Sequence, residues 1–182
     1  MTNKVQYFEQ TFMPLADDLY NYAYHLTLQQ ANAEDLVQET LIKVFKSIDQ
    51  FDKGTNAKAW MFTILKNSFI NQYRKQKASP SIVDYEDYII KESNDTVWLD
   101  TDLEDYHQFL GDEMTVALDE LKEEFREVIL LCDMEDFSYE EIAAIADIPI
   151  GTVRSRLHRA RKELQIKLKN YANSLGFKTE KL

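Results

Sequence analysis

The chain has 182 residues, with 21 Lys and Arg against 32 Asp and Glu, so its formal net charge at pH 7 is −11. Only four Gly and three Pro occur and no segment alternates apolar with polar residues, which argues against a β protein and predicts an all-α fold. There is no signal peptide and no apolar run of about eighteen residues, so we expect a protein that is neither exported nor membrane-spanning. The single cysteine, Cys132, is expected to be a packing residue in a reducing, cytoplasmic compartment.

The first elements along the chain are three predicted helices. Residues 5–28 carry two helical patterns around Pro14, and their aromatic side chains are predicted to be core rather than a ligand site. A third helix is predicted at 32–51 with Asn32 as its N-cap. Its predicted buried face consists of Val37, Leu41, Val44 and Ile48. Its outward face consists of Asp35, Gln38, Glu39, Ile42 and Lys46.

An exposed isoleucine among acidic and amide groups favours a docking surface for another helix, with an ordinary solvated face as the alternative. The loop at 51–56 follows, and a long helix is predicted from Ala57. In that helix Asn67, Asn71 and Arg74 recur at helical spacing as a polar strip, with Lys66 beside it. Amides, cations and a loop aromatic together suit single-stranded DNA, whereas the alternative is a basic helix end at a domain boundary.

The acidity of the chain is concentrated in its middle. Residues 78–113 contain one Lys and eleven Asp or Glu, whereas residues 1–77 have a net charge of +1 and residues 114–182 of −2. The middle segment has no clear period, so we predict an acidic linker, with a short helix conceivable at 102–110. Several aromatic residues interrupt its charge, and a purely solvated spacer would not need them.

Residues 114–134 are predicted to form two helices with apolar core positions at Leu118, Leu121, Phe125, Ile129 and Leu130. A helix-turn-helix pattern follows at 136–164. Ser138 and Glu141 have the spacing of a capping box, and Pro149 precedes the second helix.

The second helix of this pair is small, apolar beneath and basic on top. Val153, Leu157, Ala160 and Leu164 recur on one face of a helix. The opposite face then carries Ser155, His158, Arg159 and Lys162, flanked by Arg154 and Arg161. Residues 151–169 contain seven Lys or Arg and a single Glu. This pattern favours a DNA-recognition helix, and a solvated helical hairpin is the alternative.

Two stretches of the chain resemble a known family. The run LDELKEEFREVILL followed by FSYEEIAAIADIPIGTVRSRLHRARKEL resembles the promoter-recognising C-terminal domain of extracytoplasmic-function (ECF) sigma factors of bacterial RNA polymerase. GTVRSRLHRAR is the most specific part, and Lys122 stands where the family often has proline. The segment DLVQET resembles the part of the same family that docks on the polymerase. The two blocks occur in the family's order.

The resemblance implies a sigma factor with two small helical domains, at 1–77 and 114–182, joined by the acidic linker 78–113. It assigns polymerase docking to Asp35, Gln38 and Glu39. It matches Phe51 and Asn67 to the positions that capture a base of the melted −10 element, although Phe51 could equally be core. Together with the polar strip, we expect −10 contacts from Phe51, Asn56, Asn67, Asn71 and Arg74. It assigns contacts with the −35 element to Thr152, Arg154, Ser155, His158 and Arg159.

The implied partners are core RNA polymerase and promoter DNA. An anti-sigma factor is a further candidate, because many family members are restrained by one. We expect no catalytic activity, cofactor, metal or small-molecule substrate, since the three His are far apart and no glycine-rich phosphate loop occurs. An operator-binding regulator would leave the DLVQET face unexplained. A carboxylate-based hydrolase would draw on acidic residues that mostly lie in a segment without metal-ligand spacing.

Overall fold

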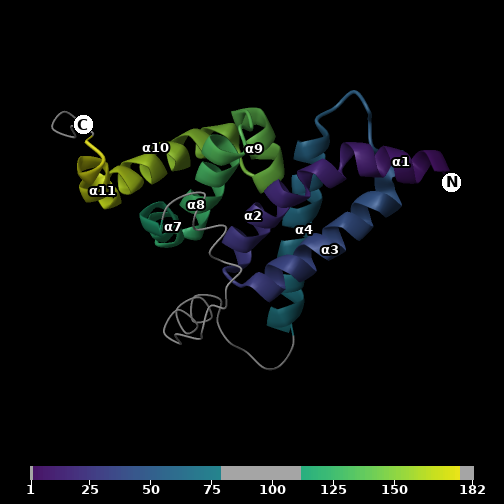
Figure 1. Ribbon diagram of the computed structural model, residues 1–182, viewed down its shortest axis with the longest axis horizontal. Coiled ribbons are helices and arrows are strands. Elements are labelled where there is room, and N and C mark those ends of the chain that lie inside the picture. The colour runs from purple at the N-terminus through teal and green to yellow at the C-terminus, as the bar shows by residue number, and fades with distance from the viewer. Residues whose placement is uncertain (1, 79–111, 177–182) are drawn as a thin grey trace.

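The computed structural model describes residues 2–78 and 112–176, and within these ranges all regular structure is helical (Figure 1). The N-terminal group of helices consists of α1 (Thr2–Thr11), the 3-10 turn η1 (Met13–Leu15), α2 (Ala16–Thr27), α3 (Gln30–Ser47), the 3-10 turn η2 (Ile48–Gln50) and α4 (Ala57–Ala78). The C-terminal group consists of α7 (Asp112–Asp119), α8 (Glu123–Ile129), the π-helical turn η3 (Leu130–Met134), α9 (Tyr139–Ala146), α10 (Ile150–Lys167) and α11 (Lys169–Ser174). Residues 79–111, and with them most of the predicted linker and the conceivable helix at 102–110, lie outside the described residues.

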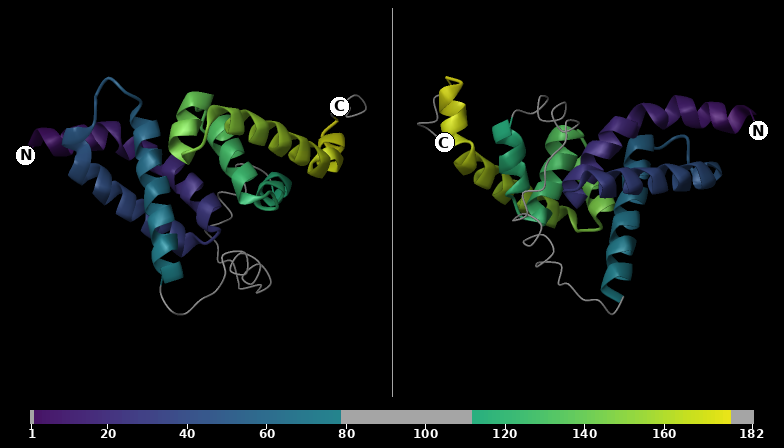
Figure 2. Two further views of the ribbon diagram at one scale, coloured as in Figure 1. Left: turned by 180° about the vertical axis from the view of Figure 1, so that it is seen from behind. Right: turned by 60° about the horizontal axis from the view of Figure 1, so that its bottom comes forward.

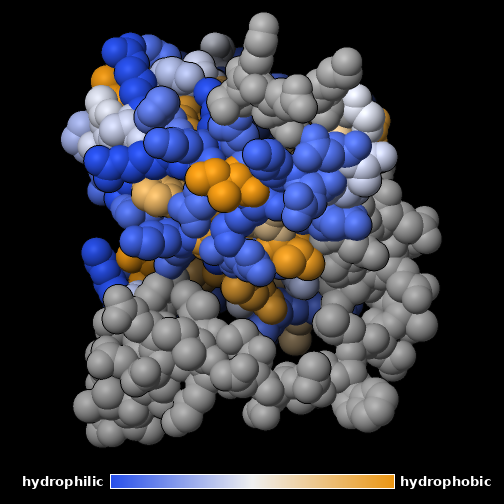
Figure 3. Space-filling view, turned by 90° about the vertical axis from the view of Figure 1, so that its left-hand side faces the viewer, coloured by the Kyte–Doolittle hydropathy of each residue, from blue (hydrophilic) through white to orange (hydrophobic). Residues whose placement is uncertain are grey.

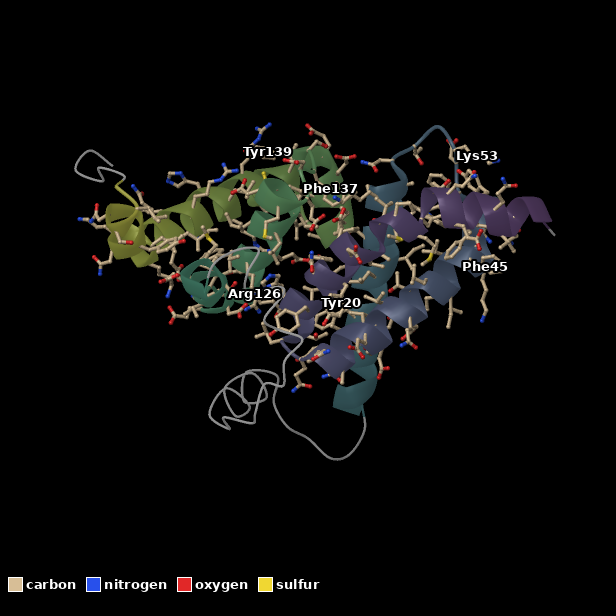
Figure 4. The ribbon with its side chains drawn as sticks, in the orientation of Figure 1. Tyr20, Phe45, Lys53, Arg126, Phe137 and Tyr139 are labelled. Atoms are coloured by element: carbon tan, nitrogen blue, oxygen red, sulfur yellow. The ribbon has the colours of Figure 1, made fainter. Side chains whose placement is uncertain are left out.

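The N-terminal group is built on aromatic packing and one sharp reversal. Phe45 of α3 meets Phe8 of α1 edge to face at a centroid distance of 5.3 Å (Figure 4). The reversal lies at Leu28, which adopts a left-handed conformation and donates its N–H to the Tyr24 carbonyl. Because this turn is so tight, α3 begins at Gln30 with Gln29 as N-cap. The prediction of Asn32 as N-cap is therefore wrong.

The buried stripe of α3 also differs from its prediction in the first half of the helix. The buried residues there are Ala33, Leu36 and Thr40, whereas Val37 and Leu41 are only partly buried. The reason is tertiary, because α3 packs against both α2 and α4 and so has two contact faces. The later positions, Val44 and Ile48, are buried as predicted.

The C-terminal group has the core that the sequence predicted. All five predicted core positions in α7 and α8, and in the turns beside them, are buried. The chain then reverses at Asp136, a left-handed residue, and places Phe137 in the core (Figure 4). Asp tolerates this conformation better than most non-glycine residues. Cys132 is partly buried, and this burial raises the pKa of its thiol.

The two groups share one apolar core. Tyr22 of α2 stacks on Phe62 of α4 at 5.1 Å, and Phe62 meets Phe137 edge to face at 5.1 Å. As a result, α4 lies beside α9 and α2 beside α8, which both views of the ribbon show (Figure 2). From this junction α10 extends away from the N-terminal group (Figure 1).

The surface at the α11 end of the molecule is mostly hydrophilic, with a few hydrophobic side chains between the polar ones (Figure 3). The exposed large hydrophobic residues of the C-terminal group are Val116, Ile166 and Leu175. Within the described residues, no helix combines the length and apolar character needed to cross a membrane.

The Leu157 side chain is 1% exposed and lies in the face of α10 that packs on the core. We expect Leu157→Ala to lower the free energy of unfolding by about 2–5 kcal/mol, because it removes buried apolar atoms and leaves a cavity. Thermal or urea unfolding followed by circular dichroism measures this loss. Ile166→Ala is the control, since Ile166 lies on the same helix with 69% of its surface exposed. Equal destabilisation by the two substitutions would contradict the inward orientation of Leu157.

Candidate nucleic-acid interface

The helix-turn-helix at 138–167 is set by local hydrogen bonds. The Ser138 hydroxyl accepts from the Glu141 N–H at 3.3 Å, and the Glu141 carboxylate accepts from the Ser138 N–H at 2.9 Å. This is the predicted capping box. At its other end, α9 stops at the left-handed Asp147, and Pro149 is the N-cap of α10. The turn between the two helices is therefore defined by Asp147 and by Pro149, which the sequence predicted to precede the second helix.

Helix α10 has the two faces that its periodicity predicted. Val153, Leu157 and Ala160 are buried. The predicted −35 residues Arg154, Ser155, His158 and Arg159 are exposed, and Thr152 is half-buried in the first turn. The Ser155 hydroxyl donates to the backbone carbonyl of Thr152 at 3.0 Å, so the Ser155 side chain supports the N-terminal turn. The exposed face is consequently available to a partner outside the chain.

The cations of α10 fall into two classes. Three of them form ion pairs with acidic residues of the preceding helices: Arg156 with Glu124 at 2.8 Å, Arg161 with Asp133 at 2.5 Å, and Lys167 with Glu120 at 2.6 Å. The Asp133 carboxylate raises the pKa of Arg161. By contrast, no ion pair within the described residues involves Arg154 or Arg159. Their charges remain available for phosphate or base edges.

The polar strip on α4 is present, because Asn67, Asn71 and Arg74 are all exposed. Asn56 lies elsewhere, at the start of the helix, where its Oδ1 accepts from the N–H groups of Lys58 and Ala59 at 3.0 and 3.3 Å. At 1.5 Å per residue, Asn56 and Asn67 are about 16 Å apart along the axis. The predicted −10 residues thus form an exposed strip and a separate position in the loop.

Two side chains near this surface are buried. Phe51 is 7% exposed, and its ring lies 5.5 Å from that of Phe12 and 5.0 Å from that of Trp60. The structure thus has Phe51 in the core, one of the two alternatives that the sequence left open, and its contact with a base stays a prediction. Lys66, expected beside the exposed strip, is also 7% exposed, because it lies against Glu127 of α8.

The predicted docking face of α3 is largely exposed. Asp35 and Gln38 point to solvent, and Ile42 is 54% exposed, as expected for an apolar side chain on this face. Glu39 differs, because it is half-buried, accepts from the Gln72 amide at 2.7 Å and pairs with Lys43 at 2.5 Å. Glu39 is therefore also engaged within the N-terminal group.

Sequence reasoning missed the polar contacts between the two groups of helices. We call this set the polar seam. Lys66 pairs with Glu127 at 2.7 Å, and the Tyr22 hydroxyl donates to the same Glu127 oxygen at 3.1 Å. Burial, with Glu127 beside it, raises the pKa of Tyr22. No local pattern could have indicated these pairs. The members of the polar seam are Tyr22, His25, Asn56, Lys58 and Lys66 on one side, and Asp119, Glu127, Glu135 and Glu141 on the other.

Lys58 and Asn56 complete the contacts at the other end of the seam. Lys58 lies 2.8 Å from Asp18 and 2.7 Å from Glu135. Burial raises the pKa of Glu135, and Lys58 opposes that effect. The Asn56 amide donates to the Glu141 carboxylate at 2.7 Å. Asn56 is thus bound to the helix-turn-helix in this arrangement. Among the described residues, no group of three His, Cys, Asp or Glu is arranged to hold a metal ion.

Comparison with known proteins identifies the family. A family model for sigma-70 region 2 matches residues 11–79, and one for sigma-70 region 4 matches residues 112–164. The ECF RNA polymerase sigma factor EcfG of Rhodopseudomonas palustris is 35% identical over 165 residues, which are 84% of this chain and 86% of EcfG. This chain belongs to the ECF sigma factors. It is therefore a transcription initiation factor that directs RNA polymerase to promoters, and it is not an enzyme.

Other ECF sigma factors agree with this assignment. SigE of Mycolicibacterium smegmatis is 39% identical over 156 residues, and the match covers 82% of this chain and 57% of SigE. Among solved structures, RpoE of Bartonella quintana in complex with the anti-sigma factor NepR has a TM-score of 0.65 and 35% identity. That match covers 89% of this chain and 96% of RpoE.

Glu141 provides a test of the capping box through pH. Burial alone would raise the pKa of its carboxyl, but hydrogen bonds from the Ser138 backbone, the Asn56 amide and the Ser138 hydroxyl outweigh burial and lower it. A lowered pKa in the folded state means stability that is present above the unfolded pKa and lost as the pH falls through the folded pKa. We therefore expect Glu141→Gln to destabilise the protein at pH 7, and the difference from wild type to shrink towards pH 3.

Melting temperatures measured by circular dichroism between pH 3 and pH 7 record this effect. Glu140→Gln is the matched control, because Glu140 is the exposed neighbour of Glu141 in the same turn. A destabilisation by Glu141→Gln that does not change with pH would mean that the carboxylate is not the stabilising species.

Proposed function

We propose that this ECF sigma factor binds the −35 element as duplex DNA with α10 and the −10 element as melted DNA with α4. Core RNA polymerase would bind the exposed face of α3 and so hold the factor against both DNA elements. The observation that carries the proposal is the division of arginines on α10. Arg156 and Arg161 are held by acidic residues of their own helical group, whereas Arg154 and Arg159 are exposed above a buried apolar face.

For the −35 element, α10 would enter the major groove with its N-terminal turns. Arg154 and Arg159 can form bidentate bonds with guanine or bind phosphate, and His158 and Ser155 lie between them on the exposed face. Thr152 would contribute from the first turn. Gly151 supports a close approach of this turn to DNA. A Cβ at position 151 would meet no atom within 4 Å, so packing within the protein does not explain why the residue is glycine.

For the −10 element, the exposed amides of Asn67 and Asn71 would contact unstacked bases, and Arg74 would contact the backbone. Asn56 would join them once it is released from Glu141. Phe51 would need to leave its pocket beside Trp60 to stack on a base. In this proposal 1–77 is the −10 and polymerase-binding domain, 78–113 the linker and 114–182 the −35-binding domain.

Docking on the polymerase would use Asp35, Gln38 and Glu39, with Ile42 as the apolar centre of the surface. The factor would act in the cytoplasm, where the polymerase works. We also propose an anti-sigma factor as a regulatory partner, because RpoE of Bartonella quintana, which has a similar fold and sequence, was solved with the anti-sigma factor NepR.

Replacing Arg159 tests the −35 assignment. We expect Arg159→Ala to leave the melting temperature unchanged and to weaken −35-dependent transcription by about 1–3 kcal/mol if Arg159 contacts a base. Transcription in vitro with core polymerase, on promoters with altered −35 sequences, measures the loss and its sequence dependence. Arg161→Ala is the control, because it removes the same charge from the same helix but at a guanidinium bound to Asp133. Unchanged −35 discrimination with Arg159→Ala would refute the proposed face of α10.

The docking surface has its own test. We expect the double substitution Asp35→Ala and Gln38→Ala to preserve the circular dichroism spectrum and to reduce pull-down of core polymerase, since both side chains are exposed. Glu9→Ala with Gln10→Ala is the matched control, because it removes the same kinds of group from the exposed surface of α1. If both double variants bind core polymerase as well as wild type, α3 is not the docking surface.

A further inference from the structure

Along α4, the polar seam has an amide and two lysines on one side and carboxylates on the other. Asn56, Lys58 and Lys66 come from the N-terminal group. The Asn56 amide donates to a carboxylate of the C-terminal group, and the two lysines form ion pairs with others. The partners are Glu141 at 2.7 Å, Glu135 at 2.7 Å and Glu127 at 2.7 Å, respectively. All three side chains belong to α4 or directly precede it, and each contacts a carboxylate. The C-terminal group thus presents to α4 a row of anions.

The charge of the C-terminal group is arranged to match. Residues 123–141 contain eight Asp or Glu and one Arg, and they include every carboxylate that contacts α4 at these three positions. The basic helix α10 lies beyond α9 and extends away from the N-terminal group (Figure 1). The C-terminal group therefore has an acidic side facing α4 and a basic side facing away from it.

The α4 face has the composition of a surface for single-stranded nucleic acid. Lys58 and Lys66 are two helical turns apart, about 12 Å along the axis. Between them lies Phe62, with Tyr22 stacked on it at 5.1 Å. Cations that follow a backbone, alternating with aromatic rings on which bases can stack, are what such surfaces use. Lys66 directly precedes Asn67, the first residue of the exposed strip.

We propose that the α4 face formed by Asn56, Lys58, Phe62 and Lys66 binds the backbone of single-stranded promoter DNA, and that Glu127, Glu135 and Glu141 occupy it in the free chain in place of phosphates. This inference rests on the proposed role of α4 and extends it to side chains that contact the C-terminal group here. An interface of this kind can open, because charged partners on both sides regain water or new counter-charges when they separate. Phosphates would replace the carboxylates, and bases would cover the ring of Phe62 that Phe137 leaves.

The test uses the full chain without polymerase and a fluorescein-labelled oligodeoxythymidine, with binding followed by fluorescence anisotropy. The variant Glu127→Gln with Glu135→Gln removes two carboxylates from the seam. Its matched control, Glu9→Gln with Glu140→Gln, changes the net charge equally but at exposed carboxylates that form no ion pair within the described residues. We expect the seam variant to bind at least about fivefold more tightly than wild type, because the competent state is more populated. If both variants gain the same affinity for the oligonucleotide, the change in net charge explains the gain and the proposal is overturned.

Replacing the lysines in the seam variant then separates a DNA contact from mere opening. With Lys58→Gln and Lys66→Gln added, we expect the gain to vanish and the slope of log affinity against log salt to fall by about 0.7 per lysine. Lys58→Arg with Lys66→Arg should keep both the affinity and the slope. If the gain and the slope survive removal of the lysines, the face does not bind phosphate.

Two measurements keep these outcomes interpretable. Circular dichroism melting shows that each variant is folded, and the lysine-to-arginine variant supports or contradicts the proposal even where the glutamine variant unfolds. Promoter-specific transcription by wild-type chain with core polymerase tests the proposed function separately. Normal initiation combined with unchanged binding of the oligonucleotide by the seam variant would therefore overturn this inference alone.

Discussion

Glu127 of α8 lies 5% exposed between the ammonium group of Lys66 and the hydroxyl of Tyr22, and the arrangement of the two helical groups depends on this contact. A carboxylate buried this deeply is stable only when its partners remain in place, since removal of one leaves an uncompensated charge. The three side chains come from α8, α4 and α2. The ion pair and the hydrogen bond of Glu127 therefore fix the position of α8, and α9 and α10 pack on α8.

The acidic residues around α8 have two different tasks. On one side, Glu124 and Asp133 pair with arginines of α10 and hold that helix. On the other side, Glu127 and Glu135 pair with lysines of α4. One short stretch of chain thus determines which cations of α10 are engaged and which face of α4 is covered.

The nature of the contact between the groups bears on function. This interface combines apolar contacts, among them Phe62 with Phe137, and several ion pairs. When an ion pair separates, water or other charges can compensate each of its two groups. An apolar surface has no such compensation when it is exposed. In the proposed function two surfaces of this chain bind separate promoter elements, and an interface that can separate would allow both to be used.

The sequence by itself determined the elements whose signals are local. The Ser138 capping box, the start of α4 at Ala57 and the buried stripe Val153, Leu157 and Ala160 all arise from residues a few positions apart, so composition and period were enough to predict them. The resemblance to ECF sigma factors also rests on runs of consecutive residues, so the sequence alone was enough to indicate the family.

Only the tertiary structure decided which candidate residues are exposed. Lys66 is covered by Glu127 and Phe51 is packed against Trp60, whereas Asn56 is exposed but bound to Glu141, 85 residues away in the chain. Tyr22 and Glu127 are 105 residues apart. A helical wheel gives the direction of a side chain relative to its own helix, but it carries no information about which other helix packs there. Contacts between distant segments depend on the packing of the whole chain, and that packing places the acidic side of one helical group on the basic face of the other.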